Sequence, residues 1–218
     1  PVNVLQASDL EGGFCHKVVG LVPDRAKKNF NRVVPAWDAS FQWNGTIEGD
    51  SSNDENSVAV MANQRGLAAE LGTDFSPQHR AKRIEKIIAS KSSWSAKEME
   101  SIHTDCYLGS AHIIIDLLKD GQGLSEAASL LVKKLTNWDF HMEAEKSEPV
   151  IFSKLRALVV NRIYDAPKLQ TLASILTENK YPELFSPWLC LKSRIAFALE
   201  NLLIKGVPGI DMQAIVCE

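Results

Sequence analysis

The sequence changes its hydrophobic pattern near Ser76, and this change limits the folds open to the chain. Before it lie extended apolar runs, at 2–7 and 14–20, and the turn chemistry of 9–13 between them predicts a β-hairpin. After it, apolar residues recur at helical spacing. A β-rich part followed by a run of helices is typical of an α+β protein. We therefore predict a β-rich segment over 1–75 and a mainly helical subdomain over 76–218.

Start and stop signals divide the helical part. Ser76 and Pro77 predict a first helix, with Arg80, Ile84, Ile87 and Ile88 on one face. Ser95 and Glu98 form a capping box that predicts a long helix to about Lys119, stopped at 120–121. Further helices are predicted over 125–138, after Pro149, over 168–179 and over 186–205.

The β-rich part also contains segments without a clear period. Residues 23–45 are expected to be irregular, with Trp37, Phe41 and Trp43 docking onto the sheet. The acidic stretch 50–57 lacks the Gly-and-Glu ending of a calcium loop, so a solvated loop is expected there.

Asn63 follows an apolar run, 58–62, whose β-branched and small residues predict a buried strand. Two roles fit an asparagine at a strand end. Its carboxamide can donate an N–H to charge developing on a neighbouring carbonyl, as in an oxyanion hole. It can equally close a turn through its own local hydrogen bonds.

Composition excludes several classes of protein. With 218 residues, 45% of them hydrophobic, the chain can bury a sizeable core. Its net charge of −3, with the basic residues scattered, argues against a nucleic-acid partner. No apolar run approaches the ~20 residues of a membrane span, and no signal-peptide pattern is present.

Cysteine and histidine spacing points to no metal site. The four cysteines form no CxxC pair and are expected to be buried small hydrophobes, although their even number leaves disulfides open: Cys15, Cys106, Cys190 and Cys217. His103 and His112 lie nine residues apart, which puts them on different faces of a helix. We therefore expect no cofactor in this chain.

Six short stretches occur in a particular order along the chain. They are DLEGGF at 9–14, VGLVPDR at 19–25, FQWNG at 41–45, HRAKRIEKII at 79–88, IHTD at 102–105 and LTNWD at 135–139. Together with the run around Asn63, and at these approximate spacings, they resemble the penicillin acylase family, a branch of the N-terminal-nucleophile hydrolases. The likeness runs from about Asp9 to at least Trp188.

The resemblance implies a four-layer αββα core, built from two chains cut from one precursor, with the helical segment inserted between core strands. It implies amide hydrolysis by a serine at the start of the catalytic chain, whose α-amino group acts as the base. Pro1 has no such side chain, so we expect the present chain to be an internal part of the catalytic chain, inactive alone. The resemblance also implies a periplasmic or extracellular parent, and it allows a calcium ion in the full-length protein.

Two site residues follow from the resemblance. Asn63 matches the oxyanion-hole asparagine of the family, and Arg80 matches the arginine placed near its active site. Arg83 is an alternative to Arg80, because the alignment after Asn63 needs a gap. Each residue also has a structural interpretation: Asn63 as a turn residue and the arginine as a solvated cation or a member of a surface ion pair. Trp138 and Asp139 are interpreted as structural.

The resulting functional hypothesis is part of a penicillin-amidase-type hydrolase of linear amides. Its substrate would be an acylated amine, such as a β-lactam or an acyl homoserine lactone, and its partners the α chain and the remaining core strands of the precursor. The alternative is a non-catalytic helical module, either a stable structural piece or one that binds a partner.

Overall fold

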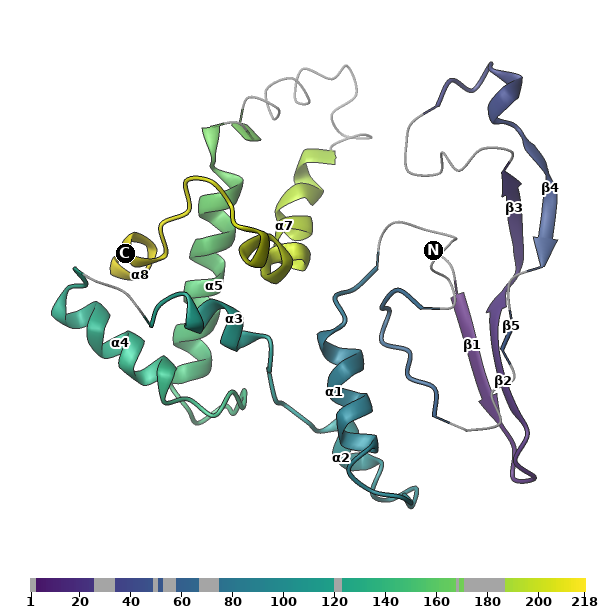
Figure 1. The fold of residues 1–218 in the computed structure, drawn as a ribbon, viewed down its shortest axis with the longest axis horizontal. Coiled ribbons are helices and arrows are strands. Elements are labelled where there is room, and N and C mark those ends of the chain that lie inside the picture. The colour runs from purple at the N-terminus through teal and green to yellow at the C-terminus, as the bar shows by residue number, and fades with distance from the viewer. Residues whose placement is uncertain are drawn as a thin grey trace. The chain divides into compact units, whose positions relative to one another are not determined.

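The computed structural model describes residues 3–25, 34–48, 51–52, 58–66, 75–119, 123–167, 169–170 and 187–218. The chain forms two compact units, Pro1–Ser92 and Ser93–Glu218, which are described separately (Figure 1). In the described ranges, the first unit contains small antiparallel sheets with short helical segments, and the second is built mainly of helices, so the predicted α+β class is confirmed. The predicted domain boundary between residues 75 and 76 stays a prediction.

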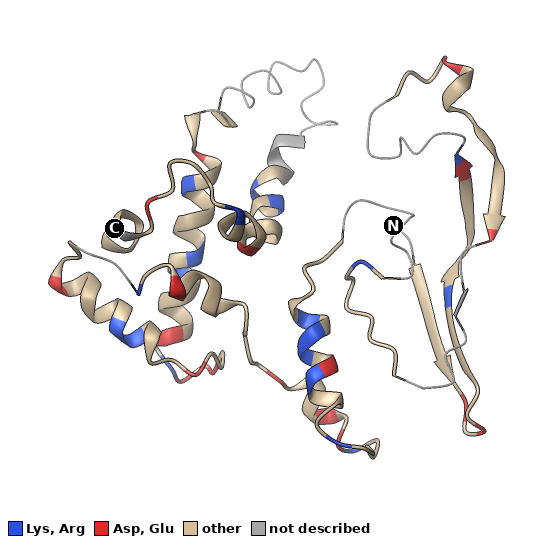
Figure 2. Ribbon diagram, in the orientation of Figure 1, with Lys and Arg blue, Asp and Glu red and all other residues tan. Residues whose placement is uncertain are grey.

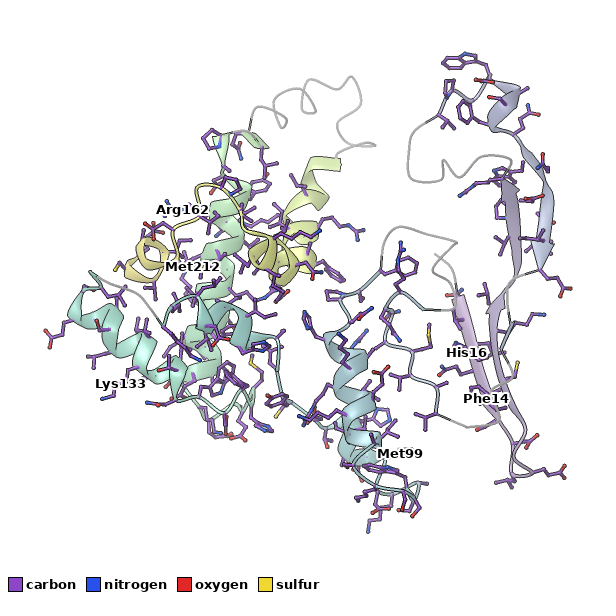
Figure 3. All side chains as sticks on the ribbon, viewed as in Figure 1. Phe14, His16, Met99, Lys133, Arg162 and Met212 are labelled. Atoms are coloured by element: carbon purple, nitrogen blue, oxygen red, sulfur yellow. The ribbon has the colours of Figure 1, made fainter. Side chains whose placement is uncertain are left out.

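The first sheet has the strand order β1-β2-β5 and contains the predicted hairpin. Strand β1 (Asn3–Ser8) pairs antiparallel with β2 (Phe14–Val19), and β2 pairs with the short β5 (Ser51–Ser52). Figure 3 shows Phe14 and His16 on β2. The Asp9 carboxylate closes the turn by accepting the backbone N–H groups of Glu11 at 2.9 Å and Gly13 at 2.7 Å. The sequence prediction of a hairpin is therefore confirmed.

The second sheet corrects the prediction for residues 23–45. Strand β3 (Leu21–Arg25) pairs with β4 (Trp43–Glu48), and a short 3-10 helix, η1, spans Ala39–Phe41. Residues 23–25, 39–41 and 43–45 are therefore regular. The pairing is irregular where β4 passes Asp24 and Arg25, and Gly45 adopts φ 133° there, which glycine tolerates within a strand. The prediction that the aromatic residues dock onto the sheet is also wrong for two of them, because Trp37 is 88% exposed and Trp43 is 59% exposed.

The predicted strand before Asn63 is not formed. Residues 58–62 are described but have no strand pairing, and Val58 is 60% exposed. The reason is local: the side chain of Gln64 accepts from the backbone N–H of Ala62 and donates to the carbonyl of Val60. These are backbone groups that a sheet ladder would use. The predicted helix after Pro77 is confirmed as α1 (His79–Ile88).

The predicted long helix after Ser95 is wrong. The capping box forms, with Glu98 accepting from the Ser95 N–H at 2.8 Å, but only the short helices α2 (Glu100–His103) and α3 (Ala111–Asp116) follow it. Between these helices the chain pairs instead with a distant segment. The Leu108 N–H donates to Phe140 at 2.8 Å, and the Met142 N–H donates to Cys106 at 3.0 Å. The predicted stop at 120–121 lies outside the described residues.

The core of the second unit is built around α5 (Glu148–Tyr164), which contacts α4 (Glu126–Thr136), α7 (Pro187–Lys205) and α8 (Met212–Cys217). Figure 3 labels Lys133 on α4, Arg162 on α5 and Met212 on α8. The apolar residues packed here are almost fully buried, among them Leu135, Phe152, Val159, Leu199 and Ile215.

Some helices in the described part of this unit match predicted ones. The helices expected from Ser125, after Pro149 and up to Lys205 are confirmed as α4, α5 and α7. Helix α8 was not predicted. Most of the helix predicted over 168–179 lies outside the described residues.

The structural interpretation of Trp138 is confirmed. Its side chain is 6% exposed, its indole N–H donates to the His141 carbonyl at 3.0 Å, and its ring packs against Phe140 and Phe152. The residue therefore joins the end of α4 to the core.

The cysteines differ from the expectation of burial. Cys15 is half-buried, while Cys106 and Cys217 are exposed, and these three are free thiols. Cys106 lies in the paired segment between α2 and α3, and Cys217 ends α8 one residue before the C-terminal Glu218. The side chain of Cys190 lies outside the described residues.

No helix in the described ranges has the length and apolarity that crossing a bilayer requires. Within the same ranges, His, Cys, Asp and Glu side chains form no group of three suited to a metal ion.

The Asp139 carboxylate should make the second unit sensitive to acid. Lys146 donates to it at 2.6 Å and is the main cause of a pKa below the ordinary 3.8, and the His141 N–H lowers the pKa further. A pKa lowered by folding contributes stability above the unfolded value, and this contribution is lost as the pH falls through the folded value. We expect Asp139→Asn to make the melting temperature fall less steeply between about pH 5 and pH 2.

The effect should be small, because the pair is exposed to solvent. Glu145→Gln is the control, since Glu145 is exposed and has no ion pair among the described residues. Equal pH profiles for wild type and Asp139→Asn would contradict the prediction.

Candidate functional site

The structure brings the two predicted site residues together. The Arg80 guanidinium donates from Nη2 to the Ala62 carbonyl at 2.6 Å and to Asn63 Oδ1 at 2.7 Å. Arg80 lies in the first turn of α1, and Asn63 precedes it by 17 residues. Both side chains are exposed. Their roles in catalysis stay predictions, but their proximity is a property of the fold.

Asn63 adopts a left-handed backbone conformation, with φ 61°. This conformation costs a residue with a Cβ roughly 1–2 kcal/mol, and asparagine is among the few residues that adopt it routinely. The Asn63 carbonyl accepts the N–H of Ser76 at 2.7 Å, and Gln64 and Ser76 form an isolated parallel bridge. Ser76 therefore holds the turn on the C-terminal side of Asn63.

The arginine also determines which way the Asn63 amide points. A guanidinium group has only donors, so the atom of the amide that faces it must be the oxygen. The amide nitrogen, Nδ2, is then directed away from Arg80, and no described residue accepts a hydrogen bond from it. Within the described residues, the Asn63 side chain is thus not bonded to its own turn, and its N–H₂ group can donate to an acceptor.

Arg80 is unfavourably placed for helix stability alone. The N-terminal end of a helix carries partial positive charge, so a cation in the first turn is disfavoured by a few tenths to about 1 kcal/mol. No acidic residue offsets this in the first turn of α1, and Figure 2 shows basic residues along the helix. The bonds to Ala62 and Asn63 account for this position. The bond to Asn63 is made by Arg80, not by the alternative, Arg83.

Sequence reasoning missed two neighbours of Asn63. Gln64 has both ends of its amide bonded to the backbone, at 2.6 Å to Ala62 and 2.7 Å to Val60. Arg65 lies with its guanidinium 5.2 Å from the centroid of the Phe75 ring, a cation–π contact. Neither contact follows from a spacing rule, because both depend on how the chain turns at Asn63.

The arrangement can stabilise negative charge on oxygen. A carboxamide whose oxygen accepts from a cation is polarised, which strengthens its N–H groups as donors. A donor fixed in this way before reaction loses little free energy to reorganisation when a carbonyl oxygen becomes charged. This is what an oxyanion hole requires of a side-chain amide.

Comparison with models of known protein families finds a match to penicillin amidase over residues 1–204. The match includes Asn63 and Arg80 and extends across both units. No curated protein matches the chain. The family covers nearly the whole sequence and confirms the resemblance seen in its motifs. The chain therefore belongs to the penicillin amidase family, a family of amidohydrolase type.

Proposed function

We propose that this chain is part of an amidohydrolase of linear acyl amides and that Asn63 supplies a side-chain donor of the oxyanion hole. The observation that carries the proposal is the contact between Arg80 and Asn63 Oδ1 at 2.7 Å, which leaves Nδ2 without a partner among the described residues. A donor held by a cation and turned outward suits a developing oxyanion better than it suits a turn closure.

In this proposal the nucleophile is an N-terminal serine outside the 218 residues. Its α-amino group takes the hydroxyl proton, and the serine oxygen attacks the acyl carbon of the substrate. The carbonyl oxygen becomes negatively charged and accepts the Asn63 N–H, together with a backbone N–H from another part of the protein. The proton then passes to the leaving amine, and water releases the acyl group.

The partner in this proposal is the rest of the same precursor, the α chain and the remaining core strands. Exposed apolar side chains on the small sheets support it. Leu5 and Val19 lie on the same face of the β1–β2 hairpin and are each 52% exposed, and Leu21 of β3 is 72% exposed. Apolar side chains grouped on a sheet are commonly covered by another surface. The proposed substrate is an acylated amine, such as a β-lactam or an acyl homoserine lactone, and the proposed compartment is the periplasm or the cell exterior.

The test is to express the longer gene product and identify the N-terminal residue of its catalytic chain by mass spectrometry. We expect cleavage that exposes a serine, and turnover of a phenylacetyl or long-chain acyl amide by the processed protein. Residues 1–218 alone are the control and are expected to show no turnover. Turnover by this chain alone would contradict an external nucleophile. A longer product that is neither processed nor active would favour the non-catalytic module.

A further inference from the structure

We propose that Gln64 is a positioning residue, whose side chain holds the Asn63 amide in the orientation that an oxyanion requires. This inference rests on the proposed function of Asn63. It adds a residue that acts through the backbone of its neighbour and does not touch the substrate.

The first step of the argument is the geometry of the Gln64 side chain. Its Oε1 accepts the backbone N–H of Ala62 at 2.6 Å, and its Nε2 donates to the backbone carbonyl of Val60 at 2.7 Å. The side chain is half-buried. One amide therefore joins two backbone positions, both on the N-terminal side of Asn63.

The second step concerns what these bonds hold in place. Asn63 has φ 61°, an infrequent conformation for a residue other than glycine, and such conformations persist when surrounding contacts determine them. Arg80 holds the Ala62 carbonyl, and the Ser76 N–H holds the Asn63 carbonyl. Gln64 holds the remaining side of the turn, the N–H of Ala62. Without it, the Met61–Ala62 peptide loses the hydrogen bond that orients it, and the segment that leads into the turn can shift together with the Asn63 amide.

The third step concerns the chemistry of the side chain. Position 64 requires a hydrogen-bond acceptor and a hydrogen-bond donor together at the end of a side chain as long as that of glutamine. An ionised glutamate keeps an acceptor for the Ala62 N–H but has no donor for the Val60 carbonyl, and it faces that carbonyl with negative charge. Methionine keeps a comparable length and removes both bonds. Methionine and glutamate therefore test the proposal in different ways, one through loss of both bonds and the other through loss of the donor.

The experiment uses the processed full-length enzyme and four variants: Asn63→Ala, Gln64→Met, Gln64→Glu and the double variant Asn63→Ala with Gln64→Met. We expect Gln64→Met and Gln64→Glu to lower kcat about 10- to 100-fold, the scale of a misplaced catalytic group, with KM nearly unchanged. In the Asn63→Ala background, Gln64→Met should lower kcat no further than about twofold, because residues acting through one another are not additive.

Gln78→Met is the matched control. Gln78 is exposed, precedes α1 and makes no capping hydrogen bond with its side chain, so kcat should stay at the wild-type value. Circular dichroism and the melting temperature identify a variant that fails to fold. If Gln64→Met fails to fold, the polar variant Gln64→Glu is used to test the proposal.

The outcomes separate the two proposals. If Asn63→Ala lowers kcat and the Gln64 variants do not, the positioning role is overturned and the function of Asn63 stands. If the Gln64 variants lower kcat equally with and without Asn63, Gln64 acts by another route and the inference is overturned. If Asn63→Ala leaves kcat unchanged, the proposed function itself fails.

Discussion

Replacing Asn63 with glycine in the processed full-length enzyme is expected to lower kcat about 100- to 1,000-fold, with KM almost unchanged. The reason is that the side-chain N–H would bond the substrate oxygen more strongly once that oxygen is charged, so its loss raises the transition state more than the bound substrate. This range corresponds to about 2.7–4 kcal/mol. Glycine is chosen because it accepts φ 61° without strain, so the change removes the amide and leaves the turn free of new strain.

Two further variants test this prediction. Asn63→Ala should lose as much activity as Asn63→Gly and also lower the melting temperature slightly, because alanine is strained at a positive φ. Asn44→Ala is the control: Asn44 is exposed on β4, and kcat should not change. Retention of more than about half of the wild-type kcat by Asn63→Gly would contradict the oxyanion role. It would leave Asn63 as a turn residue.

Replacing Phe152 with alanine is expected to destabilise the helical unit by about 3–5 kcal/mol. Phe152 is 1% exposed in the second turn of α5, and its ring centroid lies 5.5 Å from that of Trp138. Truncation removes the transfer free energy of the ring and leaves a cavity that the packed helices fill only in part. The measurement is urea unfolding followed by far-ultraviolet circular dichroism, compared with the wild type.

Val150 provides the matched control on the same helix. It is 69% exposed and lies two residues before Phe152, so Val150→Ala should change the free energy of unfolding by no more than about 0.5 kcal/mol. If Phe152→Ala cost as little as Val150→Ala, the packing of α5 against α4 and α7 would not be the source of stability in this unit.

Elements specified by nearby residues could be predicted from the sequence. Ser125 caps α4 by accepting the Ala128 N–H at 3.2 Å, and Asp9 closes the hairpin turn through bonds to residues two and four positions away. Gly206, which follows α7, has φ 77°, as a glycine that ends a helix does. These signals act over a few residues, and their geometry is almost independent of the rest of the fold.

Elements that depend on distant partners could not be predicted in this way. The segment after α2 has helical periodicity, but Tyr107 pairs with His141 instead, and the long helix is interrupted. The run before Asn63 has strand composition, but Gln64 takes its backbone groups. In both cases a competing hydrogen-bond partner, invisible to periodicity, overrides local preference.

The same distinction between local and distant determinants applies to the candidate site. The sequence, through its family motifs, identified Asn63 and Arg80 as candidate site residues, because residue type and order are properties of the chain itself. Only the tertiary structure decided that Arg80 and not Arg83 bonds Asn63, and that the amide nitrogen faces away from it. The reason is that a hydrogen bond between residues 17 positions apart exists only after α1 and the turn at Asn63 have folded against each other.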